Sequence, residues 1–232
     1  GTAMLASLLV LADRPDLLDG AGDSYHVSGL AWRALHGRPR HEAPDRVIEV
    51  FSPCAAAALY RRDAFLAAGG FDERYFCYFE DIDLAFRLRL AGHRCLLVPA
   101  SVARHHGSAL SGRESDFTIY HSHRNLVWTW VRNMPAATLW GALPHHLLMS
   151  ALTFIWYAGR GQAGPMLRAK RDALRGLPRV WRERAEVQRG RLAEPGELWE
   201  LMEHGASAYA TGWRRARASL GRVRARASGR GA

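Results

Sequence analysis

The sequence of 232 residues predicts an α/β domain followed by a helical extension, on three observations. Up to residue 106, apolar and amphipathic stretches follow one another in the order strand, helix, helix, strand. Residues 80–92 have the clearest helical periodicity of the chain, and from residue 116 onward the pattern is helical. The apolar content of 48% suits a globular protein and argues against wholesale disorder.

The first part of the chain contains the expected strands. "MLASLLVLA" (residues 4–12) reads as a buried strand or a short helix, and the polar residues 24–46 look like a long loop. "VIEVF" (47–51) and "AAAALYR" (55–61) look like strands of a buried sheet. These stretches predict a sheet whose strands are separated by turns and one long loop.

Two helices and two further strands follow. "RRDAFLAAGG" predicts a short helix that Gly69 and Gly70 close, and residues 80–92 predict a helix that Gly92 stops. In the second helix Ile82, Phe86 and Leu90 recur at a spacing of four. "RCLLVP" and "SVARHH" then read as two strands that meet at Pro99.

The charge is unevenly distributed, although the total is +10. Residues 1–158 hold 15 basic and 15 acidic side chains, whereas residues 159–232 hold 17 basic and 7 acidic ones. A basic tail on a neutral body favours an anionic partner surface. Three scattered cysteines without a CxxC pair predict no disulfide framework, which fits a reducing cytosol. Because the chain opens inside an apolar run, we expect a preceding N-terminal part.

A carboxylate cluster lies beside aromatic residues in "GGFDERYFCYFEDIDLAFRLRLAG" (residues 69–92). Asp83 precedes Arg87 by four residues, a spacing that predicts a structural ion pair. Glu80 and Asp81 have no basic partner at that spacing, and the apolar "YFCYF" precedes them. Burial beside aromatic rings raises the pKa of a carboxylate, as a general base near neutral pH requires. From the residues alone, a structural role at the helix start remains equally open.

Residues 52–108 resemble the C-terminal half of the catalytic domain of glycosyltransferase family 2, in particular members related to rhamnosyltransferases. The shared pattern is an Arg-Arg helix start, Gly-Gly-Phe-Asp-Glu, an aromatic run, Glu-Asp-x-Asp-Leu, an Arg-rich helix, a strand ending in Pro, and a His before a Gly/Ser loop. Residues 4–51 and 116–190 match more loosely. The resemblance implies a GT-A-type domain lacking its N-terminal half, with an acceptor-side half over 1–115 and a basic helical extension over 116–232.

The resemblance also implies an activity and its residues. It implies an inverting transfer of a hexose or deoxyhexose, for example rhamnose, from a nucleotide sugar to a glycan or lipid-linked acceptor in bacterial cell-envelope synthesis. Asp81 is then the base that removes the proton of the acceptor hydroxyl, and Glu80 orients the acceptor or holds Asp81. Aromatic residues form an acceptor wall, with ordinary core packing as the alternative for each. The acceptor contacts implied are Gly70, Phe71, Asp72 and Phe79.

A divalent cation is the cofactor that the resemblance implies. Counted from Pro99, His105 matches the family's metal-binding histidine, while His106 points the other way on a regular strand. Imidazole suits Mn²⁺ better than Mg²⁺. We expect the main carboxylate ligands in the missing N-terminal part, because Asp81-Ile82-Asp83 belongs to the other motif. This chain alone is therefore expected to be inactive.

The tail predicts a membrane-facing surface. Residues 136–159 are apolar, but their uninterrupted part is about a dozen residues, short of the ~20 that a spanning helix needs. An arginine stripe follows at helical spacing: Arg168, Arg171, Arg175, Arg179 and Arg182. We expect peripheral attachment to anionic lipids at the cytoplasmic face of the plasma membrane. A solvated face on a packed helix is the alternative for the stripe.

A noncatalytic module that binds an anionic membrane or a nucleic acid is the alternative for the whole chain. Nucleic-acid binding is the weaker form of that alternative, because the tail's aromatics are not interleaved with its arginines.

Overall fold

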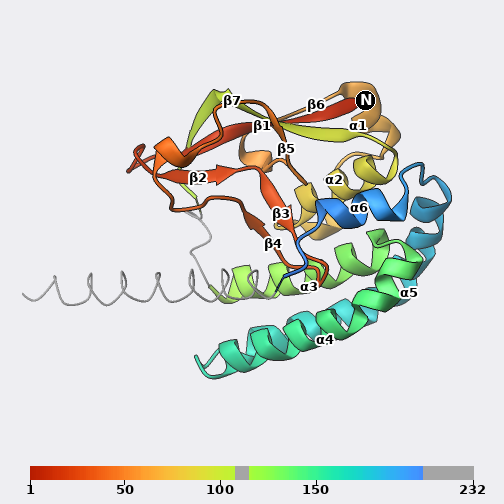
Figure 1. Cartoon of the computed structure of the whole chain (residues 1–232). Helices are drawn as coiled ribbons and strands as arrows, with labels where there is room; N and C mark the ends of the chain where they lie inside the picture. Colours follow the sequence, from red (N-terminus) through yellow and green to blue (C-terminus); the bar gives the residue numbers. More distant parts are fainter. Residues whose placement is uncertain (108–114, 206–232) are drawn as a thin grey trace, which may run out of the picture. The chain divides into compact units, whose positions relative to one another are not determined.

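A five-stranded sheet organises the first half of the chain in the computed structural model, which describes residues 1–107 and 115–205 (Figure 1). The strand order is β2-β1-β7-β5. β2 pairs with one end of β1, at residues 8–10, and β6 pairs with residues 4–6 of β1. β1 and β7 run parallel, and the other pairings in this sheet are antiparallel. The strands are β1 (Thr2–Leu11), β2 (Leu18–Ala21), β5 (Ile48–Glu49), β6 (Ala58–Tyr60) and β7 (Arg94–His105).

The apolar run of residues 4–12, which the sequence left open between a strand and a short helix, belongs to strand β1. The two strands predicted on either side of Pro99 are one strand, β7, so that expectation was wrong. The pairing with β1 is interrupted there, because Ser7 faces Val98 while Leu8 faces Val102. Proline has no N–H for a ladder, so an irregular stretch accommodates it within a continuous strand.

The stretch predicted as a long loop contains a small hairpin, so that prediction was wrong in part. β3 (Asp23–Tyr25) pairs antiparallel with β4 (Ala31–Arg33), and a 3₁₀ turn follows at Arg40–Glu42. Tyr25 is fully buried, stacks on Phe51 at 4.9 Å and meets Phe86 edge-on at 5.2 Å between ring centroids. This aromatic packing comes from distant parts of the chain, which explains why local polarity alone indicated a loop.

The helices largely follow the predicted pattern. α1 ends before Gly69 and Gly70, and α2 ends before Gly92, all with positive φ, as predicted. The α-helices are α1 (Arg62–Ala67), α2 (Glu80–Leu90), α3 (Asp116–Asn133), α4 (Ala136–Ala158), α5 (Ala163–Arg189) and α6 (Pro195–Leu201). Two short 3₁₀ turns lie at Ala55–Ala57 and Glu73–Tyr75.

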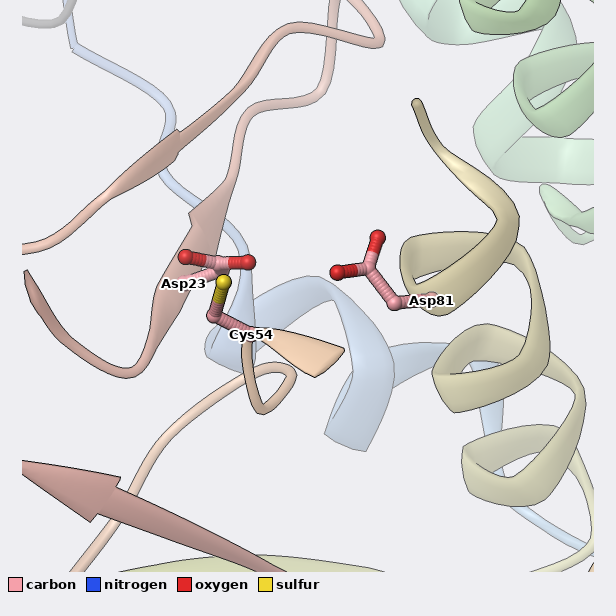
Figure 2. Close-up of side chains that lie close together, drawn as sticks. All are labelled: Asp23, Cys54 and Asp81. Atoms are coloured by element: carbon pink, nitrogen blue, oxygen red, sulfur yellow. The ribbon is translucent and has the colours of Figure 1, made fainter. Parts of the chain in front are cut away.

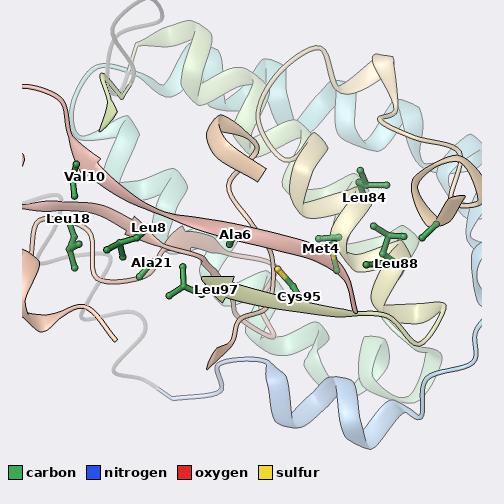
Figure 3. Packing of buried hydrophobic residues seen from close by; sticks show 13 residues of the cluster. Met4, Ala6, Leu8, Val10, Leu18, Ala21, Leu84, Leu88, Cys95 and Leu97 are labelled. Atoms are coloured by element: carbon green, nitrogen blue, oxygen red, sulfur yellow. The ribbon is translucent and has the colours of Figure 1, made fainter. Parts of the chain in front are cut away.

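Helix α2 lies between two hydrophobic clusters and is buried from Ile82 to Leu90. Leu84 and Leu88 pack against β1 and β7, in the cluster that Figure 3 shows around Met4. The other face packs with residues of α3 and α6. The buried helix fixes its own N-terminal turn, which carries the predicted catalytic carboxylates.

The fold is therefore mixed α/β with a helical part, as predicted. Residues 1–202 form one unit by their internal contacts. The predicted border between an acceptor-side half and an extension falls just before α3, and its functional meaning stays a prediction. The tail beyond residue 205 lies outside the described residues.

Candidate active site

A strained aromatic segment leads into helix α2. Phe76, Tyr78 and Phe79 have φ values of 64°, 63° and 71°. This left-handed conformation costs a bulky residue of order 1–3 kcal/mol, so the surrounding structure must hold it. Such strain concentrates at functional sites, and here it directly precedes Glu80.

Helix α3 holds this segment. The side-chain amide of Asn125 donates to the backbone carbonyls of Tyr75, Cys77 and Tyr78 at 3.0, 2.9 and 2.8 Å. Arg124 donates to the carbonyl of Tyr75 at 3.1 Å and to the Asn125 side-chain oxygen at 2.9 Å. Neither residue was predicted from the sequence. Their only signal was an Arg-Asn pair directly before the apolar run of residues 126–131 in a predicted helix.

Asp83 is a structural carboxylate, as the spacing to Arg87 predicted. It is fully buried and accepts hydrogen bonds from Tyr75 (3.1 Å), Arg87 (2.9 Å) and Asn133 (2.8 Å). Arg132 lies 3.5 Å from the same carboxylate. The network satisfies both carboxylate oxygens, so Asp83 has no oxygen left for a substrate.

Among the described residues, only backbone groups donate hydrogen bonds to Asp81. Its Oδ2 accepts from the N–H of Ala55 at 3.0 Å, and its Oδ1 accepts from the N–H of Ile82 at 2.9 Å. Burial raises the pKa of Asp81, and these backbone bonds oppose the rise without cancelling it. The direction of the shift is the one that the sequence predicted for a general base.

Glu80 has fewer partners still. Burial, and then the charge of Asp81, raise the pKa of Glu80 to about 7. Its Oε2 is buried and has no hydrogen-bond partner among the described residues. Glu80 is thus poised to exchange a proton near neutral pH, or to accept a hydrogen bond from a ligand.

Asp23 is a third carboxylate of the site, and it was not predicted from the sequence. It lies on β3, is 7% exposed, and its Oδ1 lacks a partner within the described part of the chain. Figure 2 shows its carboxylate beside the Cys54 thiol, with Asp81 pointing toward both from α2. Burial, and then the charge of Asp81, raise the pKa of Asp23 to about 8. The pair of Asp23 and Asp81 therefore binds a proton more tightly than two separate, exposed carboxyl groups would.

The spacing of this cluster also suits a cation. One ligand atom each from Asp23, Cys54 and Asp81 lies within 4.8 Å of the others. However, Arg33 already supplies a positive charge beside Asp23 and Cys54. Burial, and then the charges of Asp23 and Asp81, raise the pKa of Cys54 to about 12, so this side chain is a neutral thiol. A cation bound at this cluster would compete with the protons that the raised pKa values of Asp23 and Cys54 favour.

His105 ends β7 and belongs to a separate polar cluster. Its Nδ1 lies 2.6 Å from Oδ2 of Asp19, a fully buried residue of β2 that also forms an ion pair with Arg33. His36 Nδ1 lies 3.2 Å from the other oxygen of Asp19. Burial alone would raise the pKa of Asp19, but hydrogen bonds from both histidines hold it well below the ordinary value. His106 is exposed beyond the strand.

The predicted acceptor contacts lie around the start of α2. The carbonyl of Gly70 accepts from Arg87 at 2.8 Å, and Phe71 packs edge-on against Tyr60 and Phe65.

Asp72 forms ion pairs with Arg74 and Arg132. Burial raises the pKa of Asp72, but the hydrogen bonds from Arg74 outweigh it and hold this pKa at about 2. Phe79 directly precedes α2. Their contact with an acceptor stays a prediction.

The aromatic run divides between core and surface. Tyr75 is buried against Trp128, so core packing, the alternative left open, describes it. Phe76 is 75% exposed and contacts Phe117 and His121 of α3. Of these rings, Phe76 is therefore the one that presents the larger surface to a ligand.

Two curated proteins show what the chain is similar to. It is 36% identical over 94 residues to N-acetylglucosaminyl-diphospho-decaprenol L-rhamnosyltransferase of Mycobacterium tuberculosis, in two strains. It is 50% identical over 54 residues to Rhamnosyltransferase WbbL of Escherichia coli strain K12. These alignments cover 40% and 23% of this chain but only 30% and 20% of the two relatives. No protein-family model matches the chain.

Proposed function

We propose that this chain, whose homologues are rhamnosyltransferases, forms the acceptor side of an inverting glycosyltransferase. It would transfer a hexose or deoxyhexose such as rhamnose from a nucleotide sugar to a glycan or lipid-linked acceptor of the cell envelope. The observation that carries the proposal is Asp81, a partly buried carboxylate of raised pKa that no cationic side chain neutralises by a direct contact among the described residues.

The proposed reaction forms one bond and breaks one. The acceptor hydroxyl oxygen attacks the anomeric carbon of the donor, and the bond from that carbon to the diphosphate breaks. The hydroxyl proton passes to the Asp81 carboxylate, and the nucleoside diphosphate leaves. A single in-line displacement inverts the anomeric configuration, and a base of raised pKa accepts the proton more readily.

Asp23 and Glu80 would tune this base. The pKa values of Asp23 and Asp81 are both raised, and a proton held by Asp23 would leave the negative charge of the pair on Asp81. The unpartnered oxygen of Glu80 is available to accept a hydrogen bond from the acceptor. The strained segment before α2 holds both α2 carboxylates in place, and α3 secures that segment.

The cluster around His105 fits the expected divalent cation. A metal-binding histidine usually donates its other ring N–H to a carboxylate, and His105 Nδ1 has such a partner in Asp19. That arrangement leaves Nε2 of His105 for the cation. A bound Mn²⁺ or Mg²⁺ would neutralise charge on the departing diphosphate.

We therefore expect His105→Ala to weaken Mn²⁺ binding and donor diphosphate binding at least tenfold in the natural protein that contains this sequence. Isothermal titration with Mn²⁺, with and without nucleoside diphosphate, measures both affinities. His106→Ala is the matched control and leaves them within twofold, because its side chain is exposed. Equal affinities in the wild type and the His105 variant would remove this residue from the metal site.

A transfer assay tests the proposal as a whole. The natural protein is given nucleotide-linked L-rhamnose and an N-acetylglucosaminyl-diphospho-polyprenol, and the product is analysed by mass spectrometry and NMR. We expect an added deoxyhexose whose anomeric configuration is inverted relative to the donor. A product of retained configuration, or no transfer to any polyprenyl-diphosphate sugar with a panel of nucleotide-linked donors, would overturn it.

A further inference from the structure

Helix α4 presents an uninterrupted apolar face to solvent. The helix contains no Asp, Glu, Lys or Arg. Its large exposed side chains are Trp140, Leu147, Leu148 and Ile155, which are 53–66% exposed. They lie at spacings of seven or eight residues, so they share one face. A soluble surface rarely leaves such a row uncovered.

Helix α5 presents a second exposed face that is both apolar and basic. Leu167, Leu174 and Trp181 recur every seven residues and are 49–62% exposed. An adjacent face of the helix packs into the protein, with Ala173 and Val180 in the cluster around Trp128. Exposed arginines flank the apolar row: Arg168, Arg171, Arg175 and Arg182.

The two faces adjoin. The rings of Trp140 and Trp181 lie 6.3 Å apart, so the exposed rows of α4 and α5 border each other at that end. At the other end, residues 159–162 connect the two helices directly. Together the two rows, here called the α4–α5 face, form one surface with an apolar centre and arginines along one side.

The structure also refines the arginine stripe. Arg179 turns inward, where its guanidinium lies 4.7 Å from the ring centroid of Trp128 and pairs with Glu183 at 3.5 Å. The four other arginines stay exposed, and Asp172 is the partner of two of them, at 2.9 Å from Arg171 and 3.6 Å from Arg175. One carboxylate shared by two arginines leaves the face with a net positive charge.

We propose that the α4–α5 face docks on an anionic lipid bilayer, with its leucines and tryptophans in the interface and its arginines among the headgroups. No helix within the described ranges is long and apolar enough to cross a membrane. An interfacial helix needs a large apolar side and a basic side, both of which this face has. The negative lipids of the cytoplasmic leaflet supply the complementary charge.

The chemistry of the face favours a bilayer over two other occupants. A nucleic acid would use the arginines but leave Leu147, Leu148 and Ile155 in water, since its backbone offers no apolar surface. A second copy of the chain would cover the leucines but bring two sets of arginines together. A bilayer covers the apolar side chains and pairs the arginines with anionic headgroups at the same time. The proposal stands apart from the transfer chemistry, so either can fail alone.

Vesicle cosedimentation of the full chain tests the proposal. We expect binding to vesicles with 30% phosphatidylglycerol and little binding to pure phosphatidylcholine. Raising the salt from 0.15 to 1 M shortens the Debye length from about 8 to about 3 Å and should release most of the protein. Tryptophan fluorescence should shift to the blue on binding, because Trp140 and Trp181 leave water.

Two variants separate the charged and apolar contributions. Glutamine at Arg168, Arg171, Arg175 and Arg182 should weaken partitioning by roughly two to three orders of magnitude. Glutamine at Leu147, Leu148 and Ile155 should abolish the fluorescence shift while retaining salt-sensitive association. The matched control has glutamine at four exposed arginines elsewhere, Arg14, Arg40, Arg46 and Arg62, and should bind like the wild type. Circular dichroism confirms that each variant is folded.

Three results would overturn the proposal. The first is equal loss of binding in the control and the stripe variant, which would indicate net charge alone. The second is binding that depends only on the seven arginines between residues 214 and 230, tested by replacing them with glutamine. The third is a stable dimer, or tighter binding to duplex nucleic acid than to phosphatidylglycerol, that the substitutions on this face abolish.

Discussion

The first turn of α2 carries two aspartates that differ sharply although only one residue separates them. Asp83 is fully buried, accepts hydrogen bonds from Tyr75, Arg87 and Asn133, and lies near Arg132. Within the described part of the chain, Asp81 accepts hydrogen bonds from backbone N–H groups only, and it faces a second carboxylate, Asp23. About half a turn of helix thus separates a carboxylate saturated with cations and donors from a desolvated one that lies beside a second acid.

The difference shows what makes a carboxylate available for chemistry. Arginines and donors that saturate a carboxylate stabilise its ionised form and leave it no capacity to take a proton. A carboxylate that is desolvated beside another acid becomes more basic and retains capacity for a ligand. Both residues are aspartates of the same helical turn, so the face of the helix and the neighbours that each one meets make the difference, not the residue type.

Asp81→Asn should have the largest effect on activity. In the natural protein we expect kcat to fall by roughly 10²–10⁴-fold, because an amide cannot take the acceptor proton. Steady-state transfer kinetics measure the loss, and donor affinity should stay unchanged. A loss below tenfold would assign the proton to another group.

Asp83→Asn should instead affect stability most. Breaking a buried ion pair costs about 3–5 kcal/mol, because Arg87 is left without its partner. For a domain of this size the melting temperature should fall by roughly 6–20 °C. Calorimetry or circular dichroism measures it, with Asp63→Asn on the exposed surface of α1 as control. If Asp83→Asn melted like the wild type, the network would not be structural.

Asn125→Ala probes the strained aromatic segment that leads into α2. The carbonyls of Cys77 and Tyr78 would lose the Asn125 donor, at about 1–3 kcal/mol, while the carbonyl of Tyr75 keeps that of Arg124. We expect a smaller stability loss than at Asp83, together with a fall in kcat as Glu80 and Asp81 lose their fixed position. Denaturant unfolding and transfer kinetics test both effects. Unchanged kcat despite lower stability would separate the segment from catalysis.

Asp23→Asn should act mainly on the pH dependence of stability. Because the pKa of Asp23 rises from 3.8 to about 8 on folding, the native state binds more protons than the unfolded state between those values. Wild-type stability should therefore fall as pH rises from about 4 to 8. The variant should show a flatter profile and higher stability at pH 8 in urea unfolding. A parallel profile would show that the two aspartates do not share a proton.

Local patterns in the sequence determined the elements that depend on neighbours along the chain. The helix over residues 80–90, its glycine stop and the Asp83–Arg87 pair all follow from spacings of a few residues. The direction of the pKa shift of Glu80 and Asp81 was predicted from the apolar run before them, and burial does raise both pKa values. Two predictions that depended on distant packing failed: the division of β7 at Pro99 and the long loop that contains β3 and β4.

The tertiary structure alone decided the rest, because folding brings together residues that the sequence keeps far apart. Asp23 reaches Asp81 across 58 positions, and Asn125 secures carbonyls nearly 50 positions earlier. The helical periodicity of α4 and α5 likewise cannot tell which apolar face is covered, since that depends on the helix packed against it. The sequence thus determined which groups are available for chemistry, and three-dimensional packing decided which of them meet and which remain exposed.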